Sequence, residues 1–390
     1  MILLVIAGVL ACFVFALVAA EPFDPWRRSK SLENQRPPVN RFPSPQRRRG
    51  VGGEGDALAA INSLSISESI ARRPSTRSMP AHGKTMLLEP SPPLGIPPVP
   101  FPRDNPPTRE GIDLGRRLFF DRRLSSDEST SCASCHKPEQ AFADSEVTSR
   151  GIGGRKGARN TPAVINTAFQ PYQFWDGRVS SLEDQALLPL ENPIEMGSSI
   201  PIIVNRLKQL PEYQEAFRRV FDGPVTRDHL ARALASFQRT VLAGDSAYDQ
   251  YAAGNSTAMS KKAAEGLKLF EGKAHCRLCH QGYNFSDGLF HNLGIGWNDT
   301  RFADEGRSAV TGIVKDRGAF KTPGLRQVAQ TGPYMHDGTL ASLESVVDFY
   351  DRGGKSNPHL DPLIQPLRLT LQEKEALVEF LRSLSGKVRF

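Results

Sequence analysis

Cysteine is scarce in this chain and leaves nothing for a structural disulfide. Only five cysteines occur in 390 residues. Four of them belong to two Cys-x-x-Cys-His motifs, which end at His136 and His280, and the fifth, Cys12, lies in an apolar stretch at the N-terminus. The chain is therefore not held together by a disulfide framework, and the cysteines of the two motifs must serve another purpose.

Charged residues are absent from residues 1–20, which are apolar and end in small residues. Small residues at that place are typical of cleavage by signal peptidase, so we expect a secretory signal peptide. The basic residues that usually precede such a stretch are also absent, and Arg27, Arg28 and Lys30 follow it instead. An uncleaved N-terminal membrane anchor therefore stays open, because about 20 apolar residues can span a bilayer.

Excess positive charge is lacking in most of the chain. Residues 21–109 hold 14 Lys or Arg against 8 Asp or Glu, whereas residues 110–390 hold 35 against 34. We therefore expect no nucleic-acid binding, and the basic segment is left to contact an acidic membrane surface or nothing. Because 17 of the 30 prolines fall within residues 21–108, we predict that residues 21–103 form a disordered linker.

The two Cys-x-x-Cys-His motifs are typical of covalent haem attachment. Two thiols three residues apart lie on one side of a helical turn, where both can add to the vinyl groups of one porphyrin, and the adjacent histidine binds the iron. The residues predicted to hold two c-type haems are Cys132, Cys135, His136, Cys276, Cys279 and His280. A zinc site is the main alternative, but it would leave a histidine unexplained behind each pair of cysteines. Bacteria attach haem covalently outside the cytoplasmic membrane, so we expect a periplasmic protein.

Helical patterns and an internal repeat surround the two motifs. Helices are predicted from Thr108 through Phe120, over 226–242, from about Ser342, and from Thr370 with Glu373 as a capping box to Gly386. The sequence Gly115-Arg-Arg-Leu118-Phe119 before the first motif corresponds to Gly266-Leu-Lys-Leu269-Phe270 before the second. This repeat predicts two homologous haem domains, at residues 104–245 and 256–390, with the loop 243–255 as their boundary.

Five further motifs follow in a characteristic order. They are Arg159-Asn160-Thr161-Pro162, Phe174-Trp175-Asp176-Gly177-Arg178, Glu191-Asn192-Pro193-Ile194-Glu195-Met196-Gly197, Phe320-Lys321-Thr322-Pro323-Gly324-Leu325-Arg326 and Pro333-Tyr334-Met335-His336-Asp337-Gly338. In these residues the chain resembles the bacterial di-haem cytochrome c peroxidase family, and within it the branch of the methylamine-utilisation protein MauG. The resemblance covers roughly residues 94–386. It implies a mainly α-helical protein with two cytochrome c-like domains, a peroxidatic haem in the first and an electron-transfer haem in the second.

The same resemblance implies a calcium ion and a tryptophan between the haems. By motif, the calcium ligands would be the side chain of Asn160 and the backbone oxygens of Thr331 and Pro333, which are oxygen donors of the kind calcium prefers. The tryptophan would be Trp175, whose ring can relay an electron.

A carboxylate near the first iron would manage the protons of peroxide. By motif position this carboxylate is Glu195, with Gln185 nearby to orient peroxide or a water molecule. Glu191 is the local competitor for the same role.

The ligand on the far side of each iron decides the function. In those peroxidases of the family that need reductive activation, the first haem carries a second histidine at the position that is Ile152 here, and no histidine occurs from Lys137 to Asp228. We therefore expect the first haem to be open or to hold only water. At the second haem, the family's methionine position is occupied by Tyr350, whose phenolate would stabilise ferric iron. Ligation by Met335, or a Tyr350 that is only packed in the core, are the alternatives.

These expectations predict an oxidoreductase that reduces hydrogen peroxide at the first haem. A small cytochrome c or a cupredoxin would supply the electrons through the second haem. The alternatives are a MauG-like oxidase that uses a ferryl state to modify a protein substrate, and a di-haem electron carrier without turnover.

Overall fold

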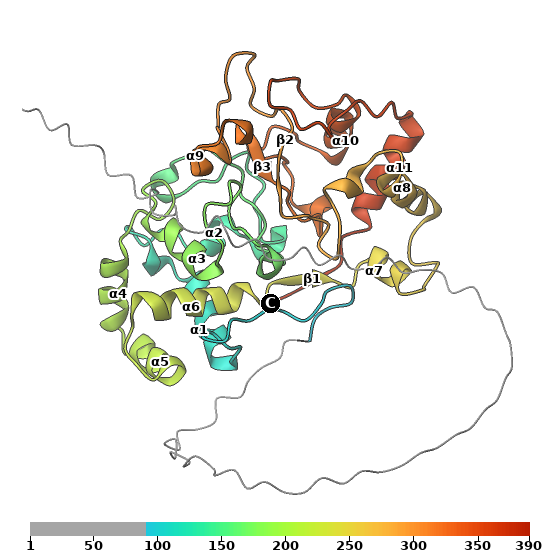
Figure 1. The fold of residues 1–390 in the computed structure, drawn as a ribbon. Coiled ribbons are helices and arrows are strands. Elements are labelled where there is room, and N and C mark those ends of the chain that lie inside the picture. The colour runs from blue at the N-terminus through green and yellow to red at the C-terminus, as the bar shows by residue number, and fades with distance from the viewer. Residues whose placement is uncertain (1–90) are drawn as a thin grey trace, which may run out of the picture. The chain divides into compact units, whose positions relative to one another are not determined.

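Helices dominate residues 91–390, the part of the chain that the computed structural model describes (Figure 1). The α-helices are α1 Arg109–Phe120, α2 Cys132–Cys135, α3 Leu182–Glu191, α4 Ile200–Lys208, α5 Pro211–Phe221, α6 Arg227–Gln238, α7 Ala247–Ala252, α8 Lys261–Glu271, α9 Ser308–Thr311, α10 Leu343–Asp351 and α11 Leu371–Arg382. Strand β1 (Leu242–Gly244) pairs with β4 (Lys387–Arg389), and β2 (Phe290–Asn292) pairs with β3 (Ala319–Lys321), both antiparallel. The expectation of a mainly α-helical fold is confirmed.

The predicted signal segment, residues 1–20, and most of the predicted linker lie outside the described residues. Within residues 91–390, none of the helices combines the length and the apolar character needed to cross a membrane.

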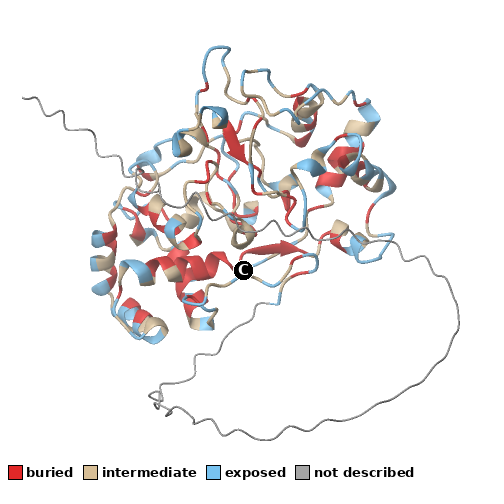
Figure 2. Cartoon of the chain, viewed as in Figure 1, coloured by how far each residue is buried: buried red, intermediate tan, exposed pale blue. Residues whose placement is uncertain are grey.

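Two hydrophobic cores organise the described residues, one behind each haem motif. The first joins α1, α3, α4, α5 and α6, and the second joins α8, α10 and α11. Figure 2 shows buried residues running along α6, at the centre of the first core. We refer to residues 109–244 as the N-terminal half and to residues 247–384 as the C-terminal half.

The internal repeat of the sequence forms the same helix crossing twice. A Cβ atom on Gly115 of α1 would lie 1.9 Å from the backbone oxygen of Ala233 in α6. A Cβ atom on Gly266 of α8 would likewise lie 1.9 Å from the backbone oxygen of Ala376 in α11. Only glycine allows two backbones to approach this closely, so the repeated glycine is a packing requirement in both halves.

The predicted helix starts are confirmed. The side chains of Thr108, Ser342 and Thr370 each accept a hydrogen bond from a backbone N–H in the first turn of α1, α10 and α11. These caps satisfy N–H groups that have no partner within the helix, which is why Ser and Thr at such places are reliable start signals.

Two predicted helix ends were wrong. The helix expected over 226–242 stops at Gln238, because Leu242 belongs to strand β1. The last helix stops at Arg382 rather than at Gly386, and the chain then forms β4. Strands of three residues carry too little hydrophobic alternation to be recognised beside a strong helical pattern.

The segment 243–255, expected to be a loop, contains the end of β1 and the helix α7. The side-chain amide of Asn166 binds both the N–H and the C=O of Ala243, which fixes the strand. Ser246 and Asp249 then cap α7 reciprocally. The proposed boundary between two domains in this region stays a prediction.

The linker was predicted to reach residue 103, but residues 91–103 pack against the folded part of the chain. Leu94 donates its N–H to the Asp245 side chain (2.7 Å) and accepts the N–H of Asp245 (3.0 Å). Ile96 is buried, and Arg326 donates to the backbone oxygen of Gly95. Residues 91–103 are therefore part of the folded unit, since these long-range contacts compensate for a proline-rich composition.

The two halves meet through polar contacts that centre on two motifs of the N-terminal half. Arg159 binds Asp176 of its own half and Asp304 of the other, each at 2.6 Å. The backbone N–H of Lys321 in β3 donates to the oxygen of Trp175 (2.8 Å). The Lys321 ammonium is buried and donates to the amide oxygen of Gln170, and burial lowers the pKa of Lys321 to about 7.

Replacing Gly115 or Gly266 by alanine should destabilise the protein by about 2 kcal/mol or more, because the new methyl group would overlap a backbone carbonyl. Chemical denaturation of each variant measures this loss. Glu265→Ala, at an exposed position on α8, is the matched control and should change stability by less than about 0.5 kcal/mol. Glycine variants as stable as the control would contradict the tight crossing.

Between about pH 7 and pH 10, Lys321 should make the stability of the protein rise relative to a variant without this lysine. In that range the unfolded chain still binds the proton that folded Lys321, with its lowered pKa, has released. The difference amounts to roughly 3–5 kcal/mol. In Lys321→Met this rise should disappear and the variant should be more stable than the parent at pH 6, as measured by denaturation across the range. Exposed Lys315→Met is the control, and an unchanged profile for Lys321→Met would refute the assignment.

Candidate haem sites

The first haem motif forms the short helix α2, and the ring of its histidine is in the state that can bind a metal ion. The backbone N–H of His136 donates to the oxygen of Cys132 (2.9 Å), and its ring atom Nδ1 lies 3.2 Å from the backbone oxygen of Phe142. Because a carbonyl only accepts, Nδ1 carries the hydrogen and Nε2 is left with a lone pair. Burial lowers the pKa of His136, which favours the neutral imidazole that iron requires.

The second motif repeats this arrangement on a 3₁₀ helical turn, Cys276–Leu278. The N–H of His280 donates to Cys276, and Nδ1 of His280 lies 2.9 Å from the backbone oxygen of Phe285. Burial again lowers the pKa of the histidine. Two prepared imidazoles, each beside two thiols, fit two covalently attached haems.

A zinc site built from both cysteines of a haem motif finds no support among residues 91–390. The one group of three or more suitable His, Cys, Asp or Glu side chains that lie together there is Cys279, Asp287 and His291. The cysteines of the first motif belong to no such group.

Glu195 lies close to the first haem motif. Burial, followed by charges that include the Glu195 carboxylate, raises the pKa values of Cys132 and Cys135. Burial also raises the pKa of Glu195 itself, although Arg178 and Asn192 oppose this change. The Asn192 amide donates to Oε1 of Glu195 at 2.7 Å.

The competitor Glu191 is exposed, and its carboxylate accepts the backbone N–H of Ile200 at the start of α4. These contacts are those of a helix-terminal residue at the surface. They distinguish it from the half-buried Glu195.

Ile152 is packed directly against the Glu195 turn. Its N–H donates to the backbone oxygen of Glu195 (2.9 Å), and its side chain covers Gly197, where a Cβ atom would lie 2.3 Å from Cδ1 of Ile152. An isoleucine offers no atom that could bind iron.

Gln185 lies on α3, which leads into the same turn. Its Oε1 atom is buried and has no hydrogen-bond partner among the described residues. A buried polar atom without a protein partner is rare and is suited to a ligand or an ordered water molecule.

Trp175 bridges the two halves. Its indole N–H donates to the backbone oxygen of Asn160 (2.9 Å), and its own backbone oxygen accepts the N–H of Lys321. Its ring is thereby fixed to the motif that follows the first haem, and its backbone to the motif that follows the second.

The predicted calcium ligands come from segments that the structure brings together. The N–H of Asn160 donates to the oxygen of His336 (2.7 Å), three residues after Pro333. The amide nitrogen of Asn160 donates to the oxygens of Glu146 and Val147, and its Oδ1 atom accepts no hydrogen bond from the described residues. Coordination of calcium by Asn160, Thr331 and Pro333 stays a prediction.

Tyr350 lies on α10 near the second haem motif. Burial, and then the neighbouring Cys276 and Cys279, raise the pKa of the phenol. Within the described residues its hydroxyl group forms no hydrogen bond, and its ring contacts Phe349 edge-on. Met335, the alternative ligand, lies in the tight turn that Gly338 closes.

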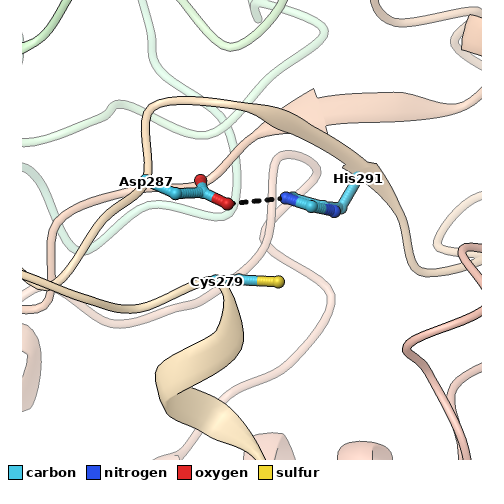
Figure 3. A group of neighbouring side chains, drawn as sticks. All are labelled: Cys279, Asp287 and His291. Atoms are coloured by element: carbon cyan, nitrogen blue, oxygen red, sulfur yellow. Dashed lines mark hydrogen bonds and ion pairs between the residues drawn. The ribbon is translucent and has the colours of Figure 1, made fainter. Parts of the chain in front are cut away.

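Sequence reasoning missed His291 of β2. Its ring lies beside Asp287 and Cys279 (Figure 3), and Asp361 contacts the other ring nitrogen. Burial alone would lower the pKa of His291, but the hydrogen bonds that its ring makes with Asp287, Cys279 and Asp361 outweigh burial and raise that pKa. Asp361 is 70 residues away in the chain, so no local motif could have indicated this cluster.

The chain is similar to proteins of known family. Residues 109–257 match the family described as di-haem cytochrome c peroxidase. The chain is 41% identical to the methylamine utilization protein MauG of Methylorubrum extorquens over 292 residues, which cover 74% of this chain and 82% of that protein. It is 40% identical to the cytochrome-c peroxidase IdrP1 of Pseudomonas sp. (strain SCT), over 75% of this chain and 86% of that protein.

The fold is also similar to a solved structure, that of a MauG-like protein associated with microbial copper homeostasis. The TM-score is 0.70 at 36% sequence identity, covering 76% of this chain and 95% of the other. With relatives of this identity and coverage, the chain belongs to the di-haem cytochrome c peroxidase family of oxidoreductases and carries the two c-type haems of that family.

Proposed function

We propose that this protein reduces hydrogen peroxide at its first haem, with electrons that arrive through the second. Each peroxide takes up two electrons and two protons and leaves as two water molecules. A small cytochrome c or a cupredoxin is the proposed electron donor. The bound haem supplies the iron redox chemistry that splits the O–O bond.

The observation that carries this proposal is the packing of Ile152. The residue stands where a second iron ligand would come from in relatives that need reductive activation. Its side chain covers Gly197 and its N–H is bound to Glu195. An isoleucine held in this way leaves the first haem accessible to peroxide in every redox state.

Glu195 is the proposed proton carrier. Burial raises its pKa, so the carboxyl group keeps a proton to a higher pH than an exposed glutamate does, and its carboxylate accepts a proton more readily. The hydrogen bond from Asn192 fixes Oε1 and leaves Oε2 for peroxide. Gln185, with its buried Oε1 atom, would orient the substrate or a water molecule.

Trp175 is the proposed electron relay, since it is bound to both halves of the protein. The two halves correspond to the proposed haem domains, residues 104–245 and 256–390. Calcium bound by Asn160, Thr331 and Pro333 would hold the intervening segments together. We place the protein in the periplasm, exported by residues 1–20, which would be either a cleaved signal or a membrane anchor.

A second candidate function is that of a MauG-like oxidase, which would oxidise a protein substrate. It is favoured by Tyr350, whose buried phenol lies near Cys276 and Cys279 without a hydrogen bond. An anionic oxygen ligand stabilises the oxidised states of iron, so the second haem would store the oxidising equivalents that peroxide delivers. Steady-state peroxide consumption with reduced cytochrome c, compared with peroxide-dependent modification of partner proteins, separates the two candidates.

Glu195→Gln should lower the rate of the reaction with peroxide by about a hundredfold to ten-thousandfold, because the amide cannot carry the proton. Stopped-flow absorption of the ferric holoprotein measures this rate. Glu191→Gln is the matched control and should react like the parent, since Glu191 is exposed. If Glu195→Gln retains the full rate, the proposed role is wrong.

Tyr350→Phe should convert the second haem from a low-spin to a high-spin ferric state and raise its reduction potential, because an anionic ligand is lost. EPR spectra and a redox titration of the ferric protein measure both changes. If Met335 is the ligand instead, Met335→Leu will produce the spin change and Tyr350→Phe will not. In the parent protein, a high-spin signal from the first haem supports an enzyme, and two low-spin haems would indicate an electron carrier.

A further inference from the structure

Two carboxylates hold the ring of His291 from opposite sides. Nε2 of His291 lies 3.0 Å from Oδ2 of Asp287 (Figure 3), and Nδ1 lies 2.6 Å from Oδ2 of Asp361. Ionised carboxylate oxygens only accept hydrogen bonds, so both ring nitrogens carry hydrogen and the ring is a cation. The three side chains are 15%, 5% and 17% exposed, which makes this a shielded arrangement of charges rather than a surface ion pair.

The cluster is not an independent metal site. Cys279 is the third member of the group, and its sulfur is used in the covalent bond to the second haem. A thioether carries no charge, and the two ring nitrogens of His291 already meet carboxylates. The side chains of the cluster therefore have no atoms left to bind a separate metal ion, and the cluster instead supports the haem attachment site.

Asp287 ties one side of the cluster to the haem motif. Its backbone N–H donates to the oxygen of Cys279 at 2.8 Å. The carboxylate that holds His291 is thus fixed relative to the residue that anchors the second haem, one position before His280.

Asp361 ties the other side to the segment that follows Tyr350. This segment, residues 352–366, leaves the end of α10 and returns at Leu367, whose N–H donates to the oxygen of Asp351 (3.0 Å). It is bound to the end of β2 by the N–H of Asp361, which donates to Asn292 (3.0 Å).

The backbones approach closely at the same place. A Cβ atom on Gly294 would lie 2.0 Å from the oxygen of Lys355, so the segment after β2 and the segment after α10 are in direct contact. His291 is the charged connection within this contact, and it faces Asp361 from the adjacent strand.

We infer that His291 is a positioning residue for the second haem. Through Asp287 on one side and Asp361 on the other, it connects the haem motif to the segment that ends the Tyr350 helix. It thereby keeps the Tyr350 phenol within reach of the haem. This inference rests on the proposed ligation by Tyr350.

The test compares the second-haem EPR signal of the ferric holoprotein in five variants. His291→Gln leaves Asp287 and Asp361 without the intervening cation, so the segment 352–366 should move away. We expect the ratio of Tyr350-ligated to unligated second haem to fall about tenfold or more, while the signal of the first haem is unchanged. His359→Gln, in the same segment but outside the cluster, is the matched control and should behave like the parent.

Asp361→Asn is the milder variant and keeps the test decisive if His291→Gln does not load haem. It weakens only the contact between His291 and the segment 352–366. We therefore expect the ratio of Tyr350-ligated to unligated second haem to fall less than in His291→Gln. Adding Asp361→Asn to His291→Gln should recover part of the ligated signal, because the two carboxylates no longer repel each other. A merely structural role for His291 would instead lower stability and leave the ligation of the second haem as it is.

Tyr350→Phe separates the two ways of failing. If Tyr350→Phe changes the second-haem signal and neither His291→Gln nor Asp361→Asn does, the positioning role is overturned and the proposed ligation stands. If Tyr350→Phe leaves the signal unchanged, the ligation by Tyr350 is wrong and the inference falls with it.

Discussion

One hydrogen bond in each half, from Nδ1 of the haem-motif histidine to a backbone carbonyl, is the interaction on which the rest of the structure depends. The accepting residues are Phe142 and Phe285, and both adopt a left-handed backbone, with φ of 57° and 53°. This conformation costs a bulky residue roughly 1–3 kcal/mol and persists only where the surroundings enforce it. Here the enforcing contacts are aromatic, since Phe119 packs on Phe142 and Phe270 packs on Phe285, with ring centroids 6.2 Å apart in both pairs. The two phenylalanines that pack on the strained residues end the repeated sequence Gly-x-x-Leu-Phe, so the repeat prepares an iron ligand twice.

The asymmetry of the protein lies in what surrounds these two equivalent centres. The N-terminal half places a carboxyl group with a raised pKa near its haem motif, and α3 carries a buried amide oxygen that has no hydrogen-bond partner among the described residues. The C-terminal half places a buried phenol near its motif and a histidine between two carboxylates at its edge. Proton transfer needs a group that can change its charge near neutral pH, whereas a permanent ligand needs a fixed donor. The difference in side chains therefore fits a division of labour between a reacting haem and a haem that exchanges electrons.

The contact between the halves joins the sequence motifs that follow each haem. Trp175, Asn160 and Lys321 form one continuous set of backbone and indole hydrogen bonds, and Arg159 adds an ion pair to Asp304. Lys321 is buried there, and no carboxylate of residues 91–390 pairs with it. Burying an ammonium group without a counter-charge is costly, so Lys321 lowers the stability of the protein at the contact beside Trp175. Residues that break the rules of stability in this way are typical of functional sites.

The sequence by itself predicted the haem attachment residues and the iron-binding histidines, and it determined the repeated Gly-x-x-Leu-Phe segment and the starts of α1, α10 and α11. These features are local, because they depend on spacings of three to five residues within one turn or one helix cap. Only the tertiary structure decided that residues 91–103 belong to the fold, that α6 and α11 give way to a two-stranded sheet, and that His291 connects Asp287 with Asp361. Each of these features depends on partners more than 60 residues apart, as in the pairing of β1 with β4 and of His291 with Asp361. Hydrogen bonds and ion pairs of that kind leave no periodic trace in the chain, since they act only after folding has brought the partners together.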